Sequence, residues 1–292
     1  MTSELQRLNR LLLCGLVMMA AGLGLSMNPA GLEPDGTYDA VLPQHLFAFT
    51  RPALVVDEGH WNRFTSANLL APLVKVAARD GFRVERNRSR FSGGSLQGIR
   101  VLVVAGARSM PSSLDSIVRS VGARIDRPAF NPAEVEALRD WVRSGGSLLF
   151  AVGDEVSAQQ SVPLLECFGM RLISAAGPGP RVYERRNYSL LPHPVTDGRE
   201  YNETALRILT YGGPAFSPPP GTRPFLALGS GLAQGVAFEF GRGRVAVVGD
   251  PVCLTALARS ADYRSERFGM SAPGADNADL VINTLRWLAR AY

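Results

Sequence analysis

The stretch from Trp141 to Glu155 places the tightest limit on the fold of this chain. It begins in the last turn of a predicted helix, turns at Gly145-Gly146, and continues as an apolar run from Leu148 to Val152 that ends at Gly153-Asp154. A helix, a glycine turn, a buried strand and a polar residue after the strand form the repeating unit of a parallel α/β sheet. Because ligands of such sheets bind outside the carboxyl ends of the strands, the stretch also indicates where a site is expected.

The rest of the chain repeats this alternation. Predicted buried strands cover residues 53–57, 99–105 and 245–250, and predicted helices cover residues 66–80, 132–143 and 277–291. Asn131-Pro132-Ala133-Glu134 opens the second helix with a cap residue, a proline and an acid in the first turn. Residues 181–240 change to short strands separated by glycine and proline, which favours a small antiparallel extension or insertion. The predicted fold is a flavodoxin-like three-layer α/β sandwich with a mostly parallel sheet, formed by residues 52–292 as one domain.

The N-terminal region has the composition of a targeting segment. Arg7 and Arg10 precede an uncharged, apolar stretch from Leu11 to Met27. As a helix, these residues would reach about 26 Å, against about 30 Å for the hydrocarbon core of a bilayer. Residues 1–27 are therefore interpreted as a hydrophobic helix that is either a signal peptide or a membrane anchor, and residues 28–51, rich in proline and glycine, as a linker. This arrangement predicts a cell-envelope protein, anchored to or exported across the inner membrane, with its globular domain outside the cytoplasm.

The net charge does not indicate nucleic-acid binding. The chain has a formal charge of +5 and a pI near 9.4, but its basic residues are scattered and Lys75 is its single lysine. A phosphate-binding surface is marked by clustered basic residues rather than by net charge, so no nucleic-acid partner is expected.

Polar residues follow several of the predicted strands, and parallel strands would bring them to one edge of the sheet. Three carboxylates with a histidine suit a divalent metal or acid/base chemistry, whereas an aspartate that caps a helix or fixes a loop gives the same pattern. A second histidine lies in the turn-rich segment and is expected to approach this edge, and two further polar residues precede the last helix. The candidate ligand-binding residues are Asp57, His60, Asp154, His193, Asp250, Asp276 and Asn277.

A nucleophile is missing from this inventory. No Gly-x-Ser-x-Gly or Gly-x-Cys-x-Gly motif follows a strand, and no glycine pattern matches a dinucleotide or phosphate loop. Cys167 falls on a helix stripe and Cys253 follows the final strand. We therefore expect no catalytic residue, no cofactor and no metal in the leading interpretation.

The order of several short motifs resembles that of the class I glutamine amidotransferase-like superfamily. More narrowly, it resembles bacterial envelope proteins of unknown function whose domain is related to those of intraflagellar transport proteins and of gliding-motility ABC-transport auxiliary proteins. The resemblance covers residues 52–292. It rests on Asp57-Glu58-Gly59-His60, Phe130 to Glu134 with Leu138 to Gly146, Phe168-Gly169, His193-Pro194 with Gly198, Gly243 to Asp250, and Asp276-Asn277 before Trp287-Leu288.

The resemblance implies a binding function without amidotransferase activity. Active amidotransferases carry their cysteine nucleophile at the elbow after the glycine–strand unit, where this chain has Gly153-Asp154-Glu155. The related domains imply a binding or assembly role toward carbohydrate or a membrane-protein partner. Two alternatives stay open: a metal- or carboxylate-dependent hydrolase that uses the same Asp/His residues, and an auxiliary subunit of an ABC-type transporter with an exposed apolar patch.

Overall fold

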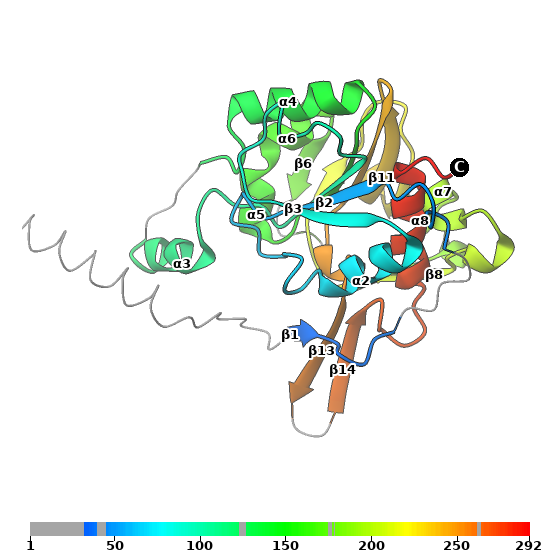
Figure 1. Ribbon diagram of the computed structural model, residues 1–292. Coiled ribbons are helices and arrows are strands. Elements are labelled where there is room, and N and C mark those ends of the chain that lie inside the picture. Colours follow the sequence, from blue (N-terminus) through cyan, green and yellow to red (C-terminus); the bar gives the residue numbers. More distant parts are fainter. Residues whose placement is uncertain (1–31, 40–44, 123–126, 175–176, 178, 262–263) are drawn as a thin grey trace, which may run out of the picture.

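The computed structural model describes residues 32–39, 45–122, 127–174, 177, 179–261 and 264–292. It shows a mixed α/β fold in which helices cover a large sheet (Figure 1). The prediction of an α/β fold with a large, mostly parallel sheet and additional antiparallel strands is therefore confirmed. The predicted N-terminal hydrophobic helix lies outside the described residues. Within these ranges, no helix has the length and apolar character needed to cross a membrane.

Five parallel strands form one half of the large sheet. They are β2 (Ala53–Asp57), β3 (Arg83–Asn87), β4 (Val101–Ala105), β5 (Ser147–Ala151) and β12 (Gly243–Val248), in the spatial order β3-β2-β4-β5-β12. Numbered along the chain, this order is 2-1-3-4-5, one of the two common orders of doubly wound sheets. The direction of winding reverses between β2 and β4, so these two strands define the switch point where such sheets bind ligands.

The other half of the large sheet is antiparallel. β11 (Leu232–Phe240) pairs with β12 and is followed by β9 (Ala215–Ser217) and β6 (Arg171–Ser174), while β10 (Pro224–Gly229) also pairs with β11. Of the two alternatives for residues 181–240, the antiparallel extension describes β9, β10 and β11, which continue the main sheet. The exception is the two-stranded sheet of β7 (Arg181–Glu184) and β8 (Arg207–Thr210), with the short helices η1 (Arg185–Asn187), α7 (Pro194–Asp197) and η2 (Tyr201–Glu203) in the connection.

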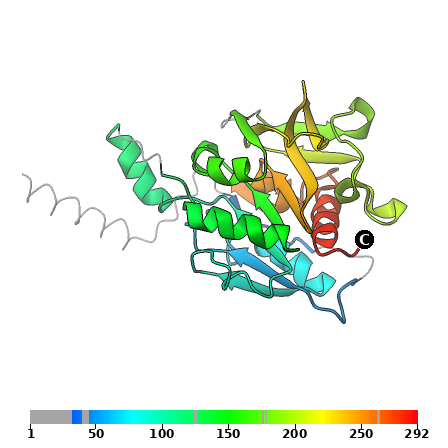
Figure 2. The same cartoon turned by 90° about the horizontal axis from the view of Figure 1, so that it is seen from above.

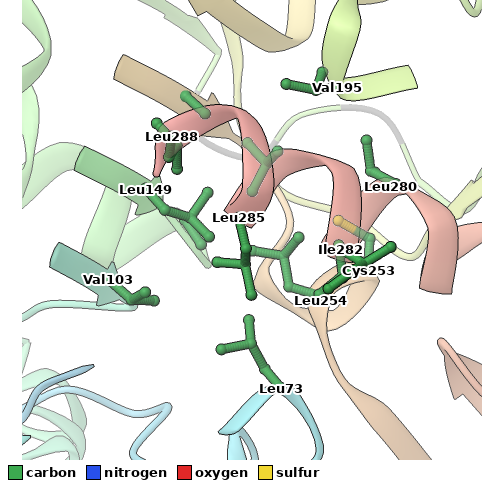
Figure 3. Close-up of a cluster of buried hydrophobic side chains, with 14 of the residues drawn as sticks. Leu73, Val103, Leu149, Val195, Cys253, Leu254, Leu280, Ile282, Leu285 and Leu288 are labelled. Atoms are coloured by element: carbon green, nitrogen blue, oxygen red, sulfur yellow. The ribbon is translucent and has the colours of Figure 1, made fainter. Parts of the chain in front are cut away.

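Alternate residues of the strands bury their side chains on opposite faces of the sheet. On one face, α2 (Ala71–Asp80) and α8 (Asn277–Leu288) pack against Leu54 and Val56. Figure 3 shows this core, with α8 side chains packed around Leu73, Leu149 and Cys253. On the other face, residues of α4 (Pro132–Arg143), α5 (Glu155–Gln160) and α6 (Val162–Cys167) pack around strand residues of opposite parity: Val55, Leu102, Val104, Leu148, Phe150, Val245 and Val247. The three layers follow from this burial of both faces.

Much of the predicted linker is packed onto the domain. β1 (Leu32–Pro34) pairs with β13 (Ala256–Ala261), which pairs with β14 (Arg264–Gly269) in a small sheet that extends from the body of the protein (Figure 1). Asp39 then forms ion pairs with Lys75 and Arg79 of α2, and the amide of Leu46 donates to the Asp80 carboxylate at 3.1 Å. Sequence periodicity missed these contacts because each depends on residues that are distant in the chain.

One helix lies apart from the layers. α3 (Ser112–Ser120) follows the carboxyl end of β4 and projects from the body in two perpendicular views (Figures 1 and 2). η3 (Pro251–Leu254) leads from β12 into β13. Both α3 and the small sheet therefore leave the domain from the carboxyl edge of the parallel strands.

Candidate functional site at the switch point of the sheet

His60 lies in the loop after β2 and is enclosed by two carboxylates. Its Nδ1 lies 2.8 Å from Oδ2 of Asp57, its Nε2 lies 2.8 Å from Oε1 of Glu134, and the imidazole has no exposed surface. The rings of Phe91 and Phe130 cover it at centroid distances of 4.5 and 4.7 Å. Burial alone would lower the pKa of His60, but the hydrogen bonds and charges of Asp57 and then Glu134 outweigh it and raise the pKa. With both ring nitrogens bound inside the protein, His60 has no atom left for a metal or a substrate.

The two carboxylates that bind His60 also accept hydrogen bonds from backbone amides. Oδ1 of Asp57 accepts hydrogen bonds from the amide of Gly59 at 3.2 Å and from Nδ2 of Asn87 at 2.9 Å. Glu134 completes the capping box of α4 with Asn131 and also accepts from the amide of Phe91. Sequence reasoning identified Glu134 only as a helix-opening acid. The capping box can be recognised from residues close together in the sequence. The contact between Glu134 and His60 cannot, because the two residues are 74 positions apart.

Asp154 combines a structural role with exposure to solvent. Its carboxylate caps α5 by accepting from the amide of Ser157 at 3.0 Å, and its Oδ2 contacts Nη2 of Arg108 and lies 3.5 Å from Nη1 of Arg63. Burial would raise its pKa, but the charge of Arg108, the bonds from Ser157 and the charge of Arg63 lower it. Asp154 is therefore an ionised hydrogen-bond acceptor, and 36% of its side chain is exposed.

The loops after β2 and β4 are joined at the switch point by backbone hydrogen bonds. The amide of Arg108 donates to the carbonyl of His60 at 2.7 Å, and that of Arg63 donates to the carbonyl of Gly106 at 3.1 Å. Between these two bonds lies Trp61, which is 54% exposed and has a φ of +46°. A bulky residue in this region of φ costs on the order of 1–3 kcal/mol and marks a position where strain is retained for another reason.

Buried polar atoms without partners lie in the same loops. Nδ2 of Asn62, Nε of Arg108 and Oγ of Ser109 have no hydrogen-bond partner, and the residues Asn62 and Arg108 are only 9% and 6% exposed. A buried donor left unpaired costs about 1–3 kcal/mol, so three in adjacent loops need an explanation. We call Trp61, Asn62, Arg63, Arg108, Ser109 and Asp154 the switch-point site. Of these six residues, the sequence singled out Asp154.

Asp250 lies at the same edge but away from this site. It follows β12, three strand spacings from β2, which corresponds to about 14 Å. Its two oxygens accept from the amides of Val252 at 2.9 Å and Tyr211 at 2.6 Å, and burial raises its pKa to about 6. The thiol of Cys253 donates to the Asp250 carbonyl, and both Cys253 and Cys167 are free thiols. Asp250 therefore fixes the start of η3.

His193 caps α7. Its Nδ1 accepts from the amide of Val195 at 3.2 Å, and its ring packs edge-on against Trp287 at 5.2 Å. Burial lowers the pKa of His193 to about 4, so the imidazole is neutral at pH 7. The predicted approach of His193 to the other candidate residues is not seen, because these contacts hold it beside α8.

Asp276 and Asn277 attach β8 to the start of α8. Oδ2 of Asp276 accepts from the amides of Leu206 and Arg207, while the Asn277 amide group bonds both the N–H and the carbonyl of Leu209 at 2.9 Å. The Asn277 side chain thus forms the same two hydrogen bonds with β8 that a neighbouring strand would form.

Across the described part of the chain, no three His, Cys, Asp or Glu residues are placed to hold a metal ion. The structure brings Asp57 and His60 together and places Asp154 in the neighbouring loops, while the other four candidates serve local structure elsewhere.

Asn277→Ala is expected to lower the free energy of unfolding by about 2–3 kcal/mol, because it removes the hydrogen bonds of a buried side chain to the N–H and the carbonyl of Leu209. Hydrogen exchange of peptides covering residues 205–211 should rise more than exchange in β4. Asn68→Ala, at an exposed asparagine, is the matched control and should leave this segment unchanged. Unchanged protection of residues 205–211 in Asn277→Ala would show that Asn277 does not hold β8.

The comparisons with known proteins concern the fold. No protein-family model matches the sequence, and no curated protein matches it. Among solved structures, the mmIFT52 N-terminal domain is similar with a TM-score of 0.54 and 19% identity over 81% of this chain and 97% of that domain. A cytoplasmic protein from Salmonella typhimurium matches with a TM-score of 0.48 and 15% identity, over 81% of this chain and 98% of the other. A ThuA-like protein from Bacteroides uniformis matches with a TM-score of 0.43 and 12% identity, over 87% of this chain and 95% of the other.

At these identities the likeness establishes the fold alone. The resemblance to intraflagellar transport domains is supported at that level, since the similar region spans nearly the whole mmIFT52 N-terminal domain. The chain therefore shares its α/β fold with the mmIFT52 N-terminal domain.

Proposed function

We propose that this chain is a non-catalytic binding module of the bacterial cell envelope, held at the membrane by residues 1–27, and that its ligand site is the switch-point site. The observation that carries the proposal is the set of unpaired buried donors beside an exposed, strained tryptophan at the reversal of strand order. Related envelope proteins that the sequence resembles suggest the same kind of role.

The acid/base groups at this edge support binding rather than catalysis. Both nitrogens of His60 and both oxygens of Asp57 are hydrogen-bonded within the protein, and the Asp250 oxygens accept hydrogen bonds from two backbone amides. A hydrolase needs such groups free to hold a metal or to take a proton from water. The carboxylate with exposed surface, Asp154, is ionised and paired with Arg108, which suits hydrogen bonding to a ligand.

The chemistry of the site favours a polyhydroxylated ligand, such as a carbohydrate. The charges of Arg63 and Arg108 face Asp154 and Asp115, so the site is close to neutral and offers donors and acceptors side by side. Sugar hydroxyls need this mixture. Trp61 offers an exposed apolar face against which the C–H face of a sugar ring can stack. Binding of this kind would also account for the retained strain at Trp61.

Trp61→Ala is expected to weaken carbohydrate binding by the full-length protein at least about tenfold, equivalent to about 1.4 kcal/mol. The measurement is isothermal titration with the best member of an oligosaccharide panel, first selected with the wild-type protein. Phe49→Ala is the matched control, since Phe49 is an exposed aromatic residue in the segment before β2, and it should leave the affinity unchanged. Equal affinity of Trp61→Ala and wild type would place the binding site elsewhere, and failure of wild type to bind any panel member would refute the carbohydrate proposal.

A further inference from the structure

The packed linker changes the distance between the domain and the membrane. A free linker of residues 28–51 would let the domain move far from residues 11–27. However, β1 is already paired at Leu32, and the chain after it is bonded to β13 and α2. Four residues, 28–31, separate Met27 from Leu32. Five Cα–Cα steps span at most about 18 Å in any conformation.

The register of the small sheet gives the direction of this short connection. Leu32 pairs with Arg259 and Pro34 pairs with Leu257, so the chain enters β1 from the distal end of the β13–β14 hairpin and runs toward the body. β13 continues two residues past Arg259, to Ala261, which adds about 7 Å in the direction from which the chain arrives. The hairpin end then lies within about 11 Å of Met27 when the chain continues along the line of β1.

The charges of this sheet neither attract nor repel a membrane strongly. Residues 32–35, 256–261 and 264–269 contain three acids and three arginines, namely Glu33, Asp35 and Glu266 with Arg259, Arg264 and Arg267. Two of the arginines already have acidic neighbours, because Arg259 pairs with Glu266 at 3.3 Å and Arg267 lies 3.7 Å from Asp35. The short connection, rather than attraction to anionic lipid, would therefore hold the sheet at the bilayer.

We infer that the distal end of the β13–β14 hairpin is the membrane-facing end of this protein and lies against the lipid headgroups. This inference rests on the membrane anchor in the proposed function and is independent of the ligand. The hairpin follows η3 at the carboxyl end of β12 and extends from the body (Figure 1), so the carboxyl edge of the sheet at β12 lies toward the bilayer. The opposite edge, at the β11–β12 turn beside Arg242, faces away.

The test compares labels at the two edges of the full-length protein in vesicles of phosphatidylethanolamine and phosphatidylglycerol. Glu266→Cys labels the hairpin at a side chain that is 60% exposed, and Arg242→Cys labels the opposite edge at an exposed residue. Cys14 and Cys167 are replaced by alanine, while Cys253 is fully buried and stays. A fluorophore at residue 266 should be quenched at least about threefold more strongly by headgroup spin-labelled lipid than one at 242, because residue 242 lies about 20 Å from the carboxyl end of β12, beyond which the hairpin begins.

The outcomes separate the orientation from the anchor. Protein that stays with the vesicles after an alkaline wash, with equal quenching at both positions, would overturn the orientation and leave the anchor intact. Protein that is released by the wash would overturn both. Insertion of about twenty Gly/Ser residues between Pro29 and Ala30 should abolish the difference in quenching, because the flexible connection then reaches well beyond its present length. A difference that survives this insertion would contradict the role of the short connection.

Discussion

Glu134→Ala is expected to lower the free energy of unfolding by about 3–5 kcal/mol, among the largest effects of any single substitution in this chain. The change removes one of the two carboxylates around a buried, protonated His60, removes half of the capping box of α4, and leaves the amide of Phe91 without its acceptor. Urea unfolding followed by circular dichroism at pH 6 measures it. Glu136→Ala, at an exposed glutamate of the same helix, should change stability by no more than about 0.5 kcal/mol.

Glu134→Gln separates charge from shape in the same cluster. Glutamine completes a capping box as glutamate does, so this variant removes mainly the negative charge that faces His60. The decrease in the free energy of unfolding caused by Glu134→Gln should be larger than that of Glu136→Ala and smaller than that of Glu134→Ala. If Glu134→Ala unfolds within about 1 kcal/mol of wild type, the ion pair is not a major source of stability.

The pH dependence of stability gives a second measurement on this cluster. Because folding raises the pKa of His60, its contribution is complete below the unfolded value near 6.5 and is lost as pH rises through the folded pKa. The pKa of His193 is lowered to about 4, and those of Asp250 and Asp279 are raised to about 6. These groups change the stability of the fold at pH values below 6.5. Wild-type stability should therefore fall as pH rises from 6.5 toward the alkaline range in which the thiols of Cys167 and Cys253 act, and His60→Gln should flatten this fall. The same slope in His60→Gln would assign the effect to another group.

The large sheet was predictable because its signal is local. Four of the five parallel strands, β2, β4, β5 and β12, are apolar runs, and those of β2, β5 and β12 end at or just before a glycine or an aspartate. Asn131 and Glu134 form the capping box that their spacing indicates, and α4 begins at the predicted Pro132. Such features are fixed by neighbours within a few residues, so they can be read without knowledge of the fold.

The site was less predictable because one residue type serves two purposes. An aspartate after a strand is placed equally well to bind a ligand or to accept from nearby amides, and Asp57 and Asp250 do the latter. Trp61 and Arg108 become notable through backbone strain and through missing partners, and both appear only when the loops after β2 and β4 meet. The docking of the predicted linker likewise depends on β13, more than 200 residues away.

Arg286→Ala is expected to cost about 3–5 kcal/mol of unfolding free energy, because it removes the cation of a fully buried ion network. Arg286 of α8 donates through Nε and Nη2 to both oxygens of Asp80, at 3.0 and 2.8 Å, and through Nη1 to Glu203 at 2.6 Å. These bonds join the last residue of α2, the last part of the β7–β8 connection and the last helix. Burial opposes the charge of Arg286, but the bond and charge of Asp80 and the charge of Glu203 outweigh it and raise its pKa.

Two variants distinguish this network from simple packing. Arg286→Lys keeps the charge but cannot reproduce the paired bonds to Asp80, so it should lose less stability than Arg286→Ala and more than a surface control. That control is Arg139→Ala, whose side chain forms ion pairs on the exposed face of α4 and should contribute at most about 0.5 kcal/mol. Urea unfolding of the three variants ranks them. Arg286→Lys as stable as wild type would show that charge alone suffices, whereas Arg286→Ala as stable as Arg139→Ala would show that the two buried carboxylates do not require a cation.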